Sequence, residues 1–367
     1  MTEIRRLASS ARIALEHPRD VLGRLCDHLA EHLQVECGDG QARLTCDFGV
    51  ARASVEGDAL AVALESADAT GLSFLRLMMA EHILAFAGEQ TPAIRWSGDG
   101  KAGEPLPYFR EMRVVSVASV TPLMRRIVLA GPDLARFTTG GLHVRLLFPP
   151  PGIAVPQWPV NGEDGRPSWP AADAKPAARA YTIRHINADR GEIAIDMVLH
   201  DDPHGNHAPG AGFAQDARPG DVVGMTGPGG GSIGEASRYI LLGDETALPA
   251  IARLLEAMPE TAEVAAFVEV ADAREEQPLA SPASLSLNWL HRNGAHAGAG
   301  ESLARAVRDH RWLAGDGETP FVWAGCEHAQ ARAIRRFVHK EAGLARDKCH
   351  IVAYWRRGAA GDEARKD

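Results

Sequence analysis

Six short β-rich segments, each separated from the next by turn residues, occupy the middle of the chain and constrain its fold most strongly. They span residues 112–119, 124–130, 142–148, 180–185, 191–199 and 221–226. Consecutive short strands of this kind are typical of an antiparallel β-barrel. Residues 149–178 interrupt the series, and their abundance of Pro, Gly and Asp predicts an irregular surface loop.

The pattern changes after the glycine-rich segment 227–231. A nearly continuous apolar strand at 238–244 precedes a helix at 248–258. Further strands at 264–270, 320–324 and 349–355 alternate with helices at 302–310 and 328–342. Alternating strands and helices indicate a doubly wound parallel sheet.

The first hundred residues form a third region. Helical spacing of apolar residues predicts helices over 21–33 and 68–86, with strands at 42–46, 49–55 and 59–64 between them. We therefore expect a multi-domain chain. A small α/β domain over residues 1–97 leads through a Gly/Pro linker to a barrel over 108–232, and a doubly wound α/β domain follows over 237–358.

Charge and cysteine content exclude several classes of protein. The formal net charge is −9, whereas a general nucleic-acid or membrane-surface binder needs an excess of Lys and Arg. We expect neither partner, although a local basic pocket remains open. The cysteines are odd in number and lack Cys-x-x-Cys spacing: Cys26, Cys37, Cys46, Cys326 and Cys349. This argues against a disulfide framework, structural zinc and a cysteine-ligated iron–sulfur cluster.

The segment 179–184, Arg-Ala-Tyr-Thr-Ile-Arg, carries the most chemistry. It resembles the flavin-binding Arg-x-Tyr-Thr-x-Arg strand of the ferredoxin–NADP reductase superfamily, whose two-domain plan is also a barrel followed by a nucleotide-type sheet. Neighbouring residues of a strand face opposite ways, so Tyr181 could lie against the isoalloxazine while Thr182 reaches the flavin edge. Arg179 or Arg184 could fork onto the pyrophosphate. Alone, the motif also fits an ordinary exposed strand; the surrounding barrel favours flavin.

Residues 108–358 further resemble the siderophore-interacting protein family of ferric-siderophore reductases. The matching segments are 143–149, 179–184, 196–200, 227–228, 243–250 and 354–358. The resemblance implies FAD in the barrel and NADPH or NADH at the doubly wound domain. Residues 1–97 resemble a small uncharacterised (DUF2218-like) domain. His28 and His32 lie four apart on its first helix, but without a third ligand we predict no metal site.

The resemblance also implies which residues hold the FAD phosphates. They are Asp196, Val198 and His200, followed by Ala211 and Ala214 in a turn of small residues. The family usually has Gly-Pro-Ala-Ser-x-Trp-Ala in that turn. This chain has Ala-Pro-Gly-Ala-Gly-Phe-Ala at 208–214, so the serine hydroxyl is missing, and backbone N–H groups remain to cradle phosphate.

The loop 243–246 follows the first strand of the doubly wound sheet, where open α/β sheets bind ligands. The resemblance places Gly243, Asp244 and Thr246 at the nicotinamide and flavin, together with Trp355 from the last strand. A capped helix start is the structural alternative. NADH and NADPH are not distinguished, although Arg274 after the second strand of the sheet stands where a 2′-phosphate partner often lies.

For the substrate, a ferric siderophore is large and often anionic, so a basic rim would hold it. The resemblance points to Arg145, Arg356 and Arg357, each of which could equally be an ordinary solvated arginine. Cys326, near a strand end, is either a thiol close to the nicotinamide or a small buried hydrophobe.

Tyr181, Thr182 and Asp244 are the expected catalytic residues. The predicted activity is transfer of electrons from NAD(P)H through FAD to Fe(III) in a siderophore, which releases Fe(II). A flavin reductase with another acceptor and a non-catalytic siderophore carrier are the alternatives. Because no apolar run suits a signal peptide or a membrane span of roughly 20 residues, we expect a cytoplasmic protein, as a monomer or weak dimer.

Overall fold

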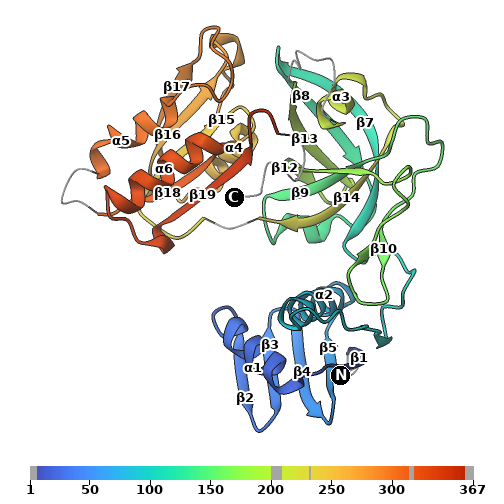
Figure 1. Ribbon diagram of the computed structural model, residues 1–367. Coiled ribbons are helices and arrows are strands. Elements are labelled where there is room, and N and C mark those ends of the chain that lie inside the picture. Colours follow the sequence, from blue (N-terminus) through green and yellow to red (C-terminus); the bar gives the residue numbers. More distant parts are fainter. Residues whose placement is uncertain (1–5, 200–208, 231–232, 314–317, 360–367) are drawn as a thin grey trace. The chain divides into compact units, whose positions relative to one another are not determined.

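The protein is represented by a computed structural model that describes residues 6–199, 209–230, 233–313 and 318–359. The chain divides into two compact units (Figure 1). The first comprises Met1–Phe109 and Pro150–Pro176, and the second comprises Arg110–Pro149 and Ala177–Asp367. Among the described residues, no helix combines the length and the apolar character that crossing a bilayer requires.

The first unit is built on an antiparallel sheet of order β2-β3-β4-β5-β1-β6. Its elements are β1 (Leu7–Ala14), α1 (Pro18–Leu29), β2 (Gln34–Gly38), β3 (Gln41–Cys46), β4 (Gly49–Glu56), β5 (Ala59–Ser66), α2 (Ala69–Phe86) and β6 (Ser97–Gly98). Both helices pack on one face of the sheet, around a core that includes Leu25, Leu64 and Leu75. The Asp68 carboxylate caps α2 by accepting from the Gly71 amide at 2.8 Å. The predicted α/β fold is confirmed, with β1, β2 and β6 as additional strands.

Residues 150–176 belong to this first unit although they lie between two barrel strands in sequence. They form the short hairpin β10 (Val160–Asn161) and β11 (Pro167–Ser168). The Trp96 indole donates to the Asp164 carbonyl at 2.8 Å, and the buried Arg76 guanidinium donates to the carbonyls of Gly100 and Gly162. The predicted irregular loop is therefore partly ordered against the N-terminal region, through contacts that a local pattern of Pro and Gly does not reveal.

The second unit begins with the barrel, whose strands close in the order β12-β13-β8-β7-β14-β9 (Figure 1). These are β7 (Phe109–Thr121), β8 (Met124–Ala130), β9 (His143–Phe148), β12 (Ala177–Asn187), β13 (Glu192–Val198) and β14 (Val222–Gly229). A short helix, α3 (Pro209–Asp216), follows β13 along the chain. Alternate residues such as Ile127, Leu146 and Ile195 fill the interior. The six predicted strands and their closure into a barrel are confirmed.

The remainder of the second unit is a parallel sheet of order β17-β16-β15-β18-β19. Its elements are β15 (Arg238–Asp244), α4 (Leu248–Glu256), β16 (Glu263–Val270), β17 (Ser284–His291), α5 (Ser302–Arg308), β18 (Phe321–Glu327), α6 (His328–Lys340) and β19 (Cys349–Trp355). Tyr239 and Leu241 of β15 pack in the cluster that contains α4, whereas Ile240 and Leu242 pack with α5 and α6. Helices thus cover both faces, and the doubly wound prediction is confirmed, with β17 as an additional edge strand.

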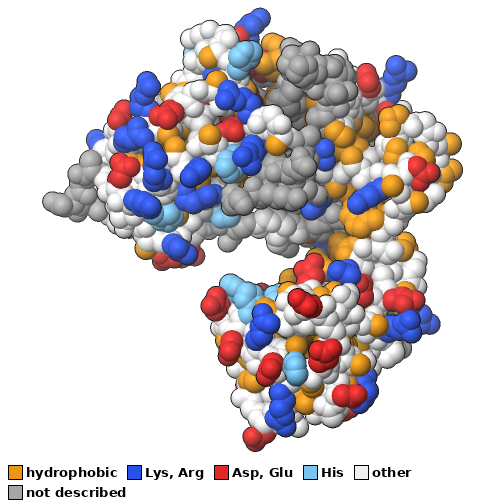
Figure 2. All heavy atoms as spheres, viewed as in Figure 1, with side chains coloured by type: hydrophobic (Ala, Val, Ile, Leu, Met, Phe, Trp, Pro, Cys, Tyr) orange, Lys and Arg blue, Asp and Glu red, His pale blue; other side chains and the backbone are white. Residues whose placement is uncertain are grey.

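Basic side chains gather locally on the second unit despite the acidic net charge. In the view of Figure 2, Lys and Arg are prominent over the part formed by α5 and α6, whereas the first unit shows both signs interspersed. The last turn of α6 carries His339 and Lys340, which suits the negative end of the helix dipole. Local basic surface therefore coexists with the formal net charge of −9.

Candidate functional site

The segment 179–184 lies in β12, paired with β9 in the barrel wall. Thr182 stands opposite His143, and Ala180 stands opposite Arg145. The Thr182 side chain is buried, with 4% of the residue exposed. Tyr181 is partly buried, its ring meets Phe148 edge-on at 6.2 Å between centroids, and burial raises the pKa of its phenol above the usual value. The tyrosine hydroxyl is thus neutral at physiological pH.

Small residues allow α3 to lie directly against this tyrosine. A Cβ atom at Gly210 would overlap the Tyr181 hydroxyl, so only glycine fits there. Ala211 and Ala214 are buried on the same helix, and the Arg125 guanidinium donates to the carbonyl of Ala214 at 3.1 Å. The described part of the expected turn, residues 209–214, is helical instead, and it forms most of α3, whose first residues are Pro, Gly, Ala and Gly.

Of the expected phosphate-binding residues, Asp196 is engaged within the barrel itself. Its carboxylate accepts from Nε and Nη2 of Arg126 at 2.7 and 2.8 Å. Val198 ends β13 and packs partly buried. His200 lies outside the described residues. Asp196 and Arg126 stand opposite each other on β13 and β8, so their ion pair links β13, which carries Asp196 and Val198, to the neighbouring strand.

Arg179 and Arg184 have different surroundings. The Arg179 guanidinium is partly buried and donates to the Ala178 carbonyl at 2.8 Å. Arg184 forms a two-pronged ion pair with Glu256 of α4, at 2.7 and 3.1 Å. Arg253 of the same helix donates to the Ile183 carbonyl at 3.0 Å. Because Glu256 holds both terminal nitrogens of Arg184, a role on the pyrophosphate would require this pair to open.

Asp244 is the centre of a buried network at the end of β15, with only 3% of the residue exposed. Its Oδ1 accepts from the Thr246 hydroxyl and amide at 2.5 and 3.0 Å. Its Oδ2 accepts from the Trp355 indole at 2.8 Å and from the Glu327 amide at 3.1 Å. Burial raises the pKa of this carboxyl from 3.8 to about 6, against the opposing effect of the Thr246 and Trp355 donors.

Two positions next to this loop, Gly243 and Gly325, have no room for a side chain. A Cβ at Gly243 would lie 2.7 Å from the Cβ of Ala247, and one at Gly325 would lie 2.9 Å from the Tyr354 ring. Distances below about 3 Å are closer than non-bonded carbons approach. The two glycines therefore bring β15 and β18 close to the helix start and to β19.

His143 and Tyr354 link the flavin-type strand to this loop. His143 Nε2 lies 2.7 Å from the Tyr354 hydroxyl, and the two rings meet edge-on at 5.4 Å. Tyr354 precedes Trp355, which donates to Asp244, and His143 stands opposite Thr182. A continuous chain of contacts therefore joins Thr182 in the barrel to Asp244 in the sheet.

Arg292 contacts the same loop through Glu245. It was not identified from the sequence. Its guanidinium donates to Glu245 Oε2 at 2.8 Å and lies 3.5 Å from Glu269 Oε1. Glu245 and Glu269 are 6% and 2% exposed. Such buried charges are tolerated because they are paired. No local signal predicts this cluster, since its members lie on separate loops and strands.

The three arginines expected at the substrate rim lie on two elements. Arg145 is partly buried on β9, whereas Arg356 and Arg357 are exposed immediately after β19. The Arg357 amide donates to Glu327 Oε1 at 3.2 Å, which fixes the chain as it leaves the sheet. Arg274 pairs with Asp272 at 2.7 Å and is largely exposed.

Cys326 is fully buried in the core shared by β18 and α6. Burial, followed by the nearby carboxylates Asp244 and Glu327, raises the pKa of its thiol well above the usual value. A thiolate is therefore strongly disfavoured, and the position behaves as a small hydrophobe. Within the described ranges, no group of three or more His, Cys, Asp or Glu side chains could hold a metal ion.

The residues around Tyr181 fit a flavin nucleotide. The barrel supplies an aromatic ring and a buried hydroxyl on neighbouring residues, and Gly210 allows α3 to approach the Tyr181 hydroxyl closely. The N-terminal amides of a helix with small side chains suit a phosphate. Asp244 and Thr246 add hydrogen-bonding groups at the carboxyl end of the parallel sheet, where open α/β sheets bind nucleotides.

Comparison with known families matches three parts of the chain. Residues 113–232 match the siderophore-interacting FAD-binding domain, and residues 236–358 match the siderophore-interacting protein family. Residues 10–97 match an uncharacterized protein conserved in bacteria (DUF2218). The expected FAD cofactor agrees with the first of these matches.

Individual relatives extend the likeness over most of the second unit. Ferric vibriobactin reductase from Vibrio cholerae is 33% identical over 255 residues, which cover 68% of this chain and 90% of the relative. An NADPH-dependent ferric-chelate reductase from Escherichia coli is 32% identical over 220 residues, 57% of this chain and 83% of the relative.

Solved structures show the same likeness. A siderophore utilization protein from T. fusca has a TM-score of 0.63 at 39% identity, covering 73% of this chain and 100% of its own. The siderophore-interacting protein SipS from Aeromonas hydrophila has a TM-score of 0.58 at 30% identity, covering 70% and 94%.

Proposed function

This chain belongs to the siderophore-interacting protein family, and we propose that it is an FAD-dependent reductase of ferric siderophores that takes its electrons from NADPH or NADH. It is an oxidoreductase with a flavin-binding barrel and a nicotinamide-type sheet. The relatives named as a ferric vibriobactin reductase and an NADPH-dependent ferric-chelate reductase support the choice of acceptor and donor. We further propose that the domains extend over residues 1–97, 108–232 and 237–358.

The contact chain from Thr182 to Asp244 is the observation that carries this proposal. It runs through His143, Tyr354 and Trp355, and it joins the flavin-type strand to the loop at the end of β15. A reductase must hold the nicotinamide donor close to the flavin and in a fixed orientation, although the two bind to different domains. A carrier that transfers no electrons does not need contacts that join these two sites.

Each proposed residue has a role that follows from its position. Bound FAD would accept electrons from the nicotinamide in pairs and pass them singly to Fe(III), chemistry that belongs to the cofactor. Tyr181 offers its ring face, and Thr182 a buried hydroxyl at the flavin edge. Arg179 and the first amides of α3 would hold the phosphates.

On the nicotinamide side, Asp244 orders Thr246 and Trp355 through hydrogen bonds, so that one buried carboxyl fixes both groups. Gly243 has no side chain, and this allows β15 to lie close to Ala247 at the start of α4. In this proposal these side chains exclude water and orient the nicotinamide donor, while the electrons reach the iron through the flavin.

The acceptor side is basic. Arg356 and Arg357 are exposed after β19, and Arg145 lies partly buried on β9. Guanidinium groups attract an anionic ferric chelate and bind its oxygens. Reduction weakens the hold of hard oxygen ligands on iron, so Fe(II) would be released in the cytoplasm.

An anaerobic titration distinguishes this function from its alternatives. Purified protein is expected to be yellow, to bleach with NADPH, and to recolour when a ferric siderophore is added, with Fe(II) trapped by an iron(II)-specific chelator. Recolouring only with other acceptors would indicate a general flavin reductase. Colourless protein that still binds the ferric siderophore would indicate a carrier.

A matched pair of variants tests the site. Thr182→Val keeps the shape of the buried side chain and removes its hydroxyl, and we expect a loss of about tenfold or more in the rate of flavin bleaching. Thr138→Val removes an exposed hydroxyl that bonds only locally, to the Ala135 carbonyl at 2.7 Å, and should leave the rate unchanged. Equal rates in both variants would contradict a role for Thr182.

A further inference from the structure

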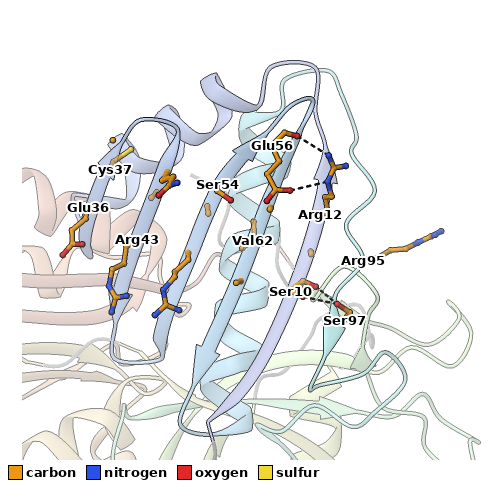
Figure 3. A pocket seen from close by; sticks show the side chains of 18 residues that line it. Ser10, Arg12, Glu36, Cys37, Arg43, Ser54, Glu56, Val62, Arg95 and Ser97 are labelled. Atoms are coloured by element: carbon orange, nitrogen blue, oxygen red, sulfur yellow. Dashed lines mark hydrogen bonds and ion pairs between the residues drawn. The ribbon is translucent and has the colours of Figure 1, made fainter.

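The sheet of the first unit has one face without helices, and this face is hollowed. The hollow has a volume of about 920 Å³ and is lined by residues of β1 to β6 (Figure 3). Sites for small organic ligands span roughly 300–1,000 Å³. The hollow is therefore large enough for a small molecule and much larger than a single ion needs.

Small side chains form its floor. Ala61 of β5 stands opposite Ser54 of β4 and Arg12 of β1, and Ala63 stands opposite Arg52 and Ser10. Larger side chains at these central positions would fill the hollow. The floor is thus open to a ligand across the middle of the sheet.

Two arginines stand directly opposite each other on this face. Arg43 of β3 pairs in register with Arg52 of β4, and both line the hollow. Figure 3 shows Arg43 on this face. Like charges at directly opposed positions destabilise a sheet. Arg52 is compensated by Glu65, whose Oε1 lies 2.8 Å from its Nη1.

Arg43 is not compensated in this way. Its side chain forms no hydrogen bond or ion pair with any described residue. Glu36 stands across from it on β2 without forming an ion pair. Arg12, by contrast, is held by Glu56 at 3.6 Å (Figure 3). The sheet face therefore presents one unpaired guanidinium beside a second one, over a floor of small residues.

We propose that this face binds a small molecule bearing several carboxylates, held by the guanidinium groups of Arg43 and Arg52. A planar guanidinium binds a carboxylate through two parallel hydrogen bonds, and two of them side by side select a ligand with more than one anionic group. Binding of that ligand relieves the repulsion between the two arginines. The site belongs to the first unit, so it stands independently of the proposed reduction in the second.

Calorimetric titration of the full-length protein tests this site. The probes are citrate, ferric citrate and, as a single-anion comparison, inorganic phosphate. We expect saturable binding of a citrate form, and a loss of at least about tenfold in affinity for Arg43→Ala and for Arg52→Ala. Arg190→Ala removes an exposed arginine of the second unit, paired with Glu192, and should change nothing.

The two citrate arms identify the source of the carboxylates. Tighter binding of ferric citrate would assign an iron-loaded chelate, and equal or tighter binding of free citrate would assign the organic acid itself. Wild-type affinity in both arginine variants, with circular dichroism showing intact folding, would overturn the proposal, as would phosphate binding as tightly as citrate. NADPH-driven reduction of ferric citrate, measured in parallel, reports on the second unit separately.

A different observation in the same unit concerns two thiols. Cys26 of α1 and Cys37 of β2 bring their Sγ atoms within 2.6 Å of each other. Cys37 is exposed and Cys26 is buried. Burial raises the pKa of the Cys26 thiol to about 12, so Cys37 is the sulfur accessible to solvent oxidants.

We infer that this pair is oxidised to a disulfide by hydrogen peroxide. Peroxide first converts the Cys37 thiol to a sulfenic acid and releases one water. The Cys26 sulfur then attacks the Cys37 sulfur, the S–O bond breaks, and a second water leaves with the Cys26 proton. The bond would tie the edge strand β2 to α1.

Peptide mass spectrometry without reductant tests the pair in the full-length protein. Peroxide treatment is expected to produce a linked Cys26–Cys37 peptide and to raise the unfolding temperature of the N-terminal unit by about 5 °C. Cys37→Ser should abolish the link, whereas Cys46→Ser, which changes a partly buried thiol of β3, should retain it. Recovery of Cys26 as a free thiol from peroxide-treated wild-type protein would overturn the inference.

Discussion

Asp244 combines burial with an ionisable group at the centre of the site. Its pKa in the folded protein is about 6, compared with 3.8 for an ordinary aspartate. A raised folded pKa means that folding favours the neutral form. The stabilising contribution is therefore fully present below pH 3.8 and is lost as the pH rises through about 6. Above that pH the ionised carboxylate is stabilised by four hydrogen bonds, donated by Thr246, Glu327 and Trp355.

This linkage predicts how Asp244→Asn changes the pH dependence of stability. Between pH 4 and 7 the wild type should lose about 2 kcal/mol relative to the variant, because most of the free energy of a shift of about two pKa units falls within this range. Urea unfolding across this range measures it. Trp355→Phe removes a donor to the carboxylate, so it should move the transition to higher pH. Parallel pH profiles for wild type and Asp244→Asn would refute the assignment.

Cys326 gives a second prediction at the residue scale. Its thiol is buried among apolar side chains and disfavours ionisation. Cys326→Ala should lower stability by about 1–2 kcal/mol through the small cavity it leaves, while the rate of flavin bleaching by NADPH stays within about twofold. Stopped-flow absorbance and urea unfolding measure the two effects. A hundredfold loss of rate with intact folding would instead make the thiol catalytic.

At the scale of elements, strands with a strong hydrophobic pattern could be predicted from the sequence, and strands without one could not. The strands β8, β15 and β19 begin and end where the pattern places them, at 124–130, 238–244 and 349–355. β1 was missed because Leu-Ala-Ser-Ser-Ala-Arg-Ile-Ala contains few β-branched or aromatic residues. β17 was missed although Leu285, Leu287 and Trp289 alternate along it, because it is a partly buried edge strand.

In the site, too, residues within a local motif could be predicted, and their partners from distant parts of the sequence could not. Thr182 and Asp244 could be singled out because a motif surrounds each of them. Their partners could not: His143 meets Tyr354 across 211 positions of sequence, and Arg184 meets Glu256 across 72. Only the closed barrel and its packing against α4 bring such residues together.

The docking of α4 on β12 leads to a prediction about Arg184. If this arginine positions the strand through Glu256, Arg184→Met and Glu256→Gln should weaken FAD binding equally, by a few-fold, and the double variant should be no worse. A partly exposed ion pair supports only about 1 kcal/mol. Fluorescence titration of the apoprotein with FAD measures all three. A far larger loss for Arg184→Met than for Glu256→Gln would place Arg184 on the pyrophosphate instead.

At the scale of the whole molecule, the chain passes between the two units three times. It leaves the first unit after Phe109, returns at Pro150 and leaves again after Pro176. The excursion separates β9 from β12, two neighbouring strands of the barrel, and the second of them carries the flavin-type motif. The N-terminal unit is thus not an appendage at one end, since its fold includes a segment inserted into the barrel sequence.

Gly165 tests whether this inserted segment depends on the N-terminal sheet. Its φ is +89°, and a Cβ there would lie 2.8 Å from the Arg76 Cβ and 2.9 Å from the Trp96 indole nitrogen. Gly152, in the same segment, has a φ of +82° with open space around it. Both substitutions by alanine carry the strain of a positive φ, so only Gly165→Ala adds a clash.

We therefore expect Gly165→Ala to destabilise the first unit by about 1–3 kcal/mol more than Gly152→Ala. Endoproteinase Glu-C should cut the variant faster after Glu163, because local opening exposes the segment. FAD absorbance should be equal in the two variants, since the barrel wall itself is untouched. Equal proteolysis of both would show that residues 150–176 hold their structure without Arg76 and Trp96, whereas loss of flavin from Gly165→Ala alone would mean that the inserted segment also supports the flavin strand.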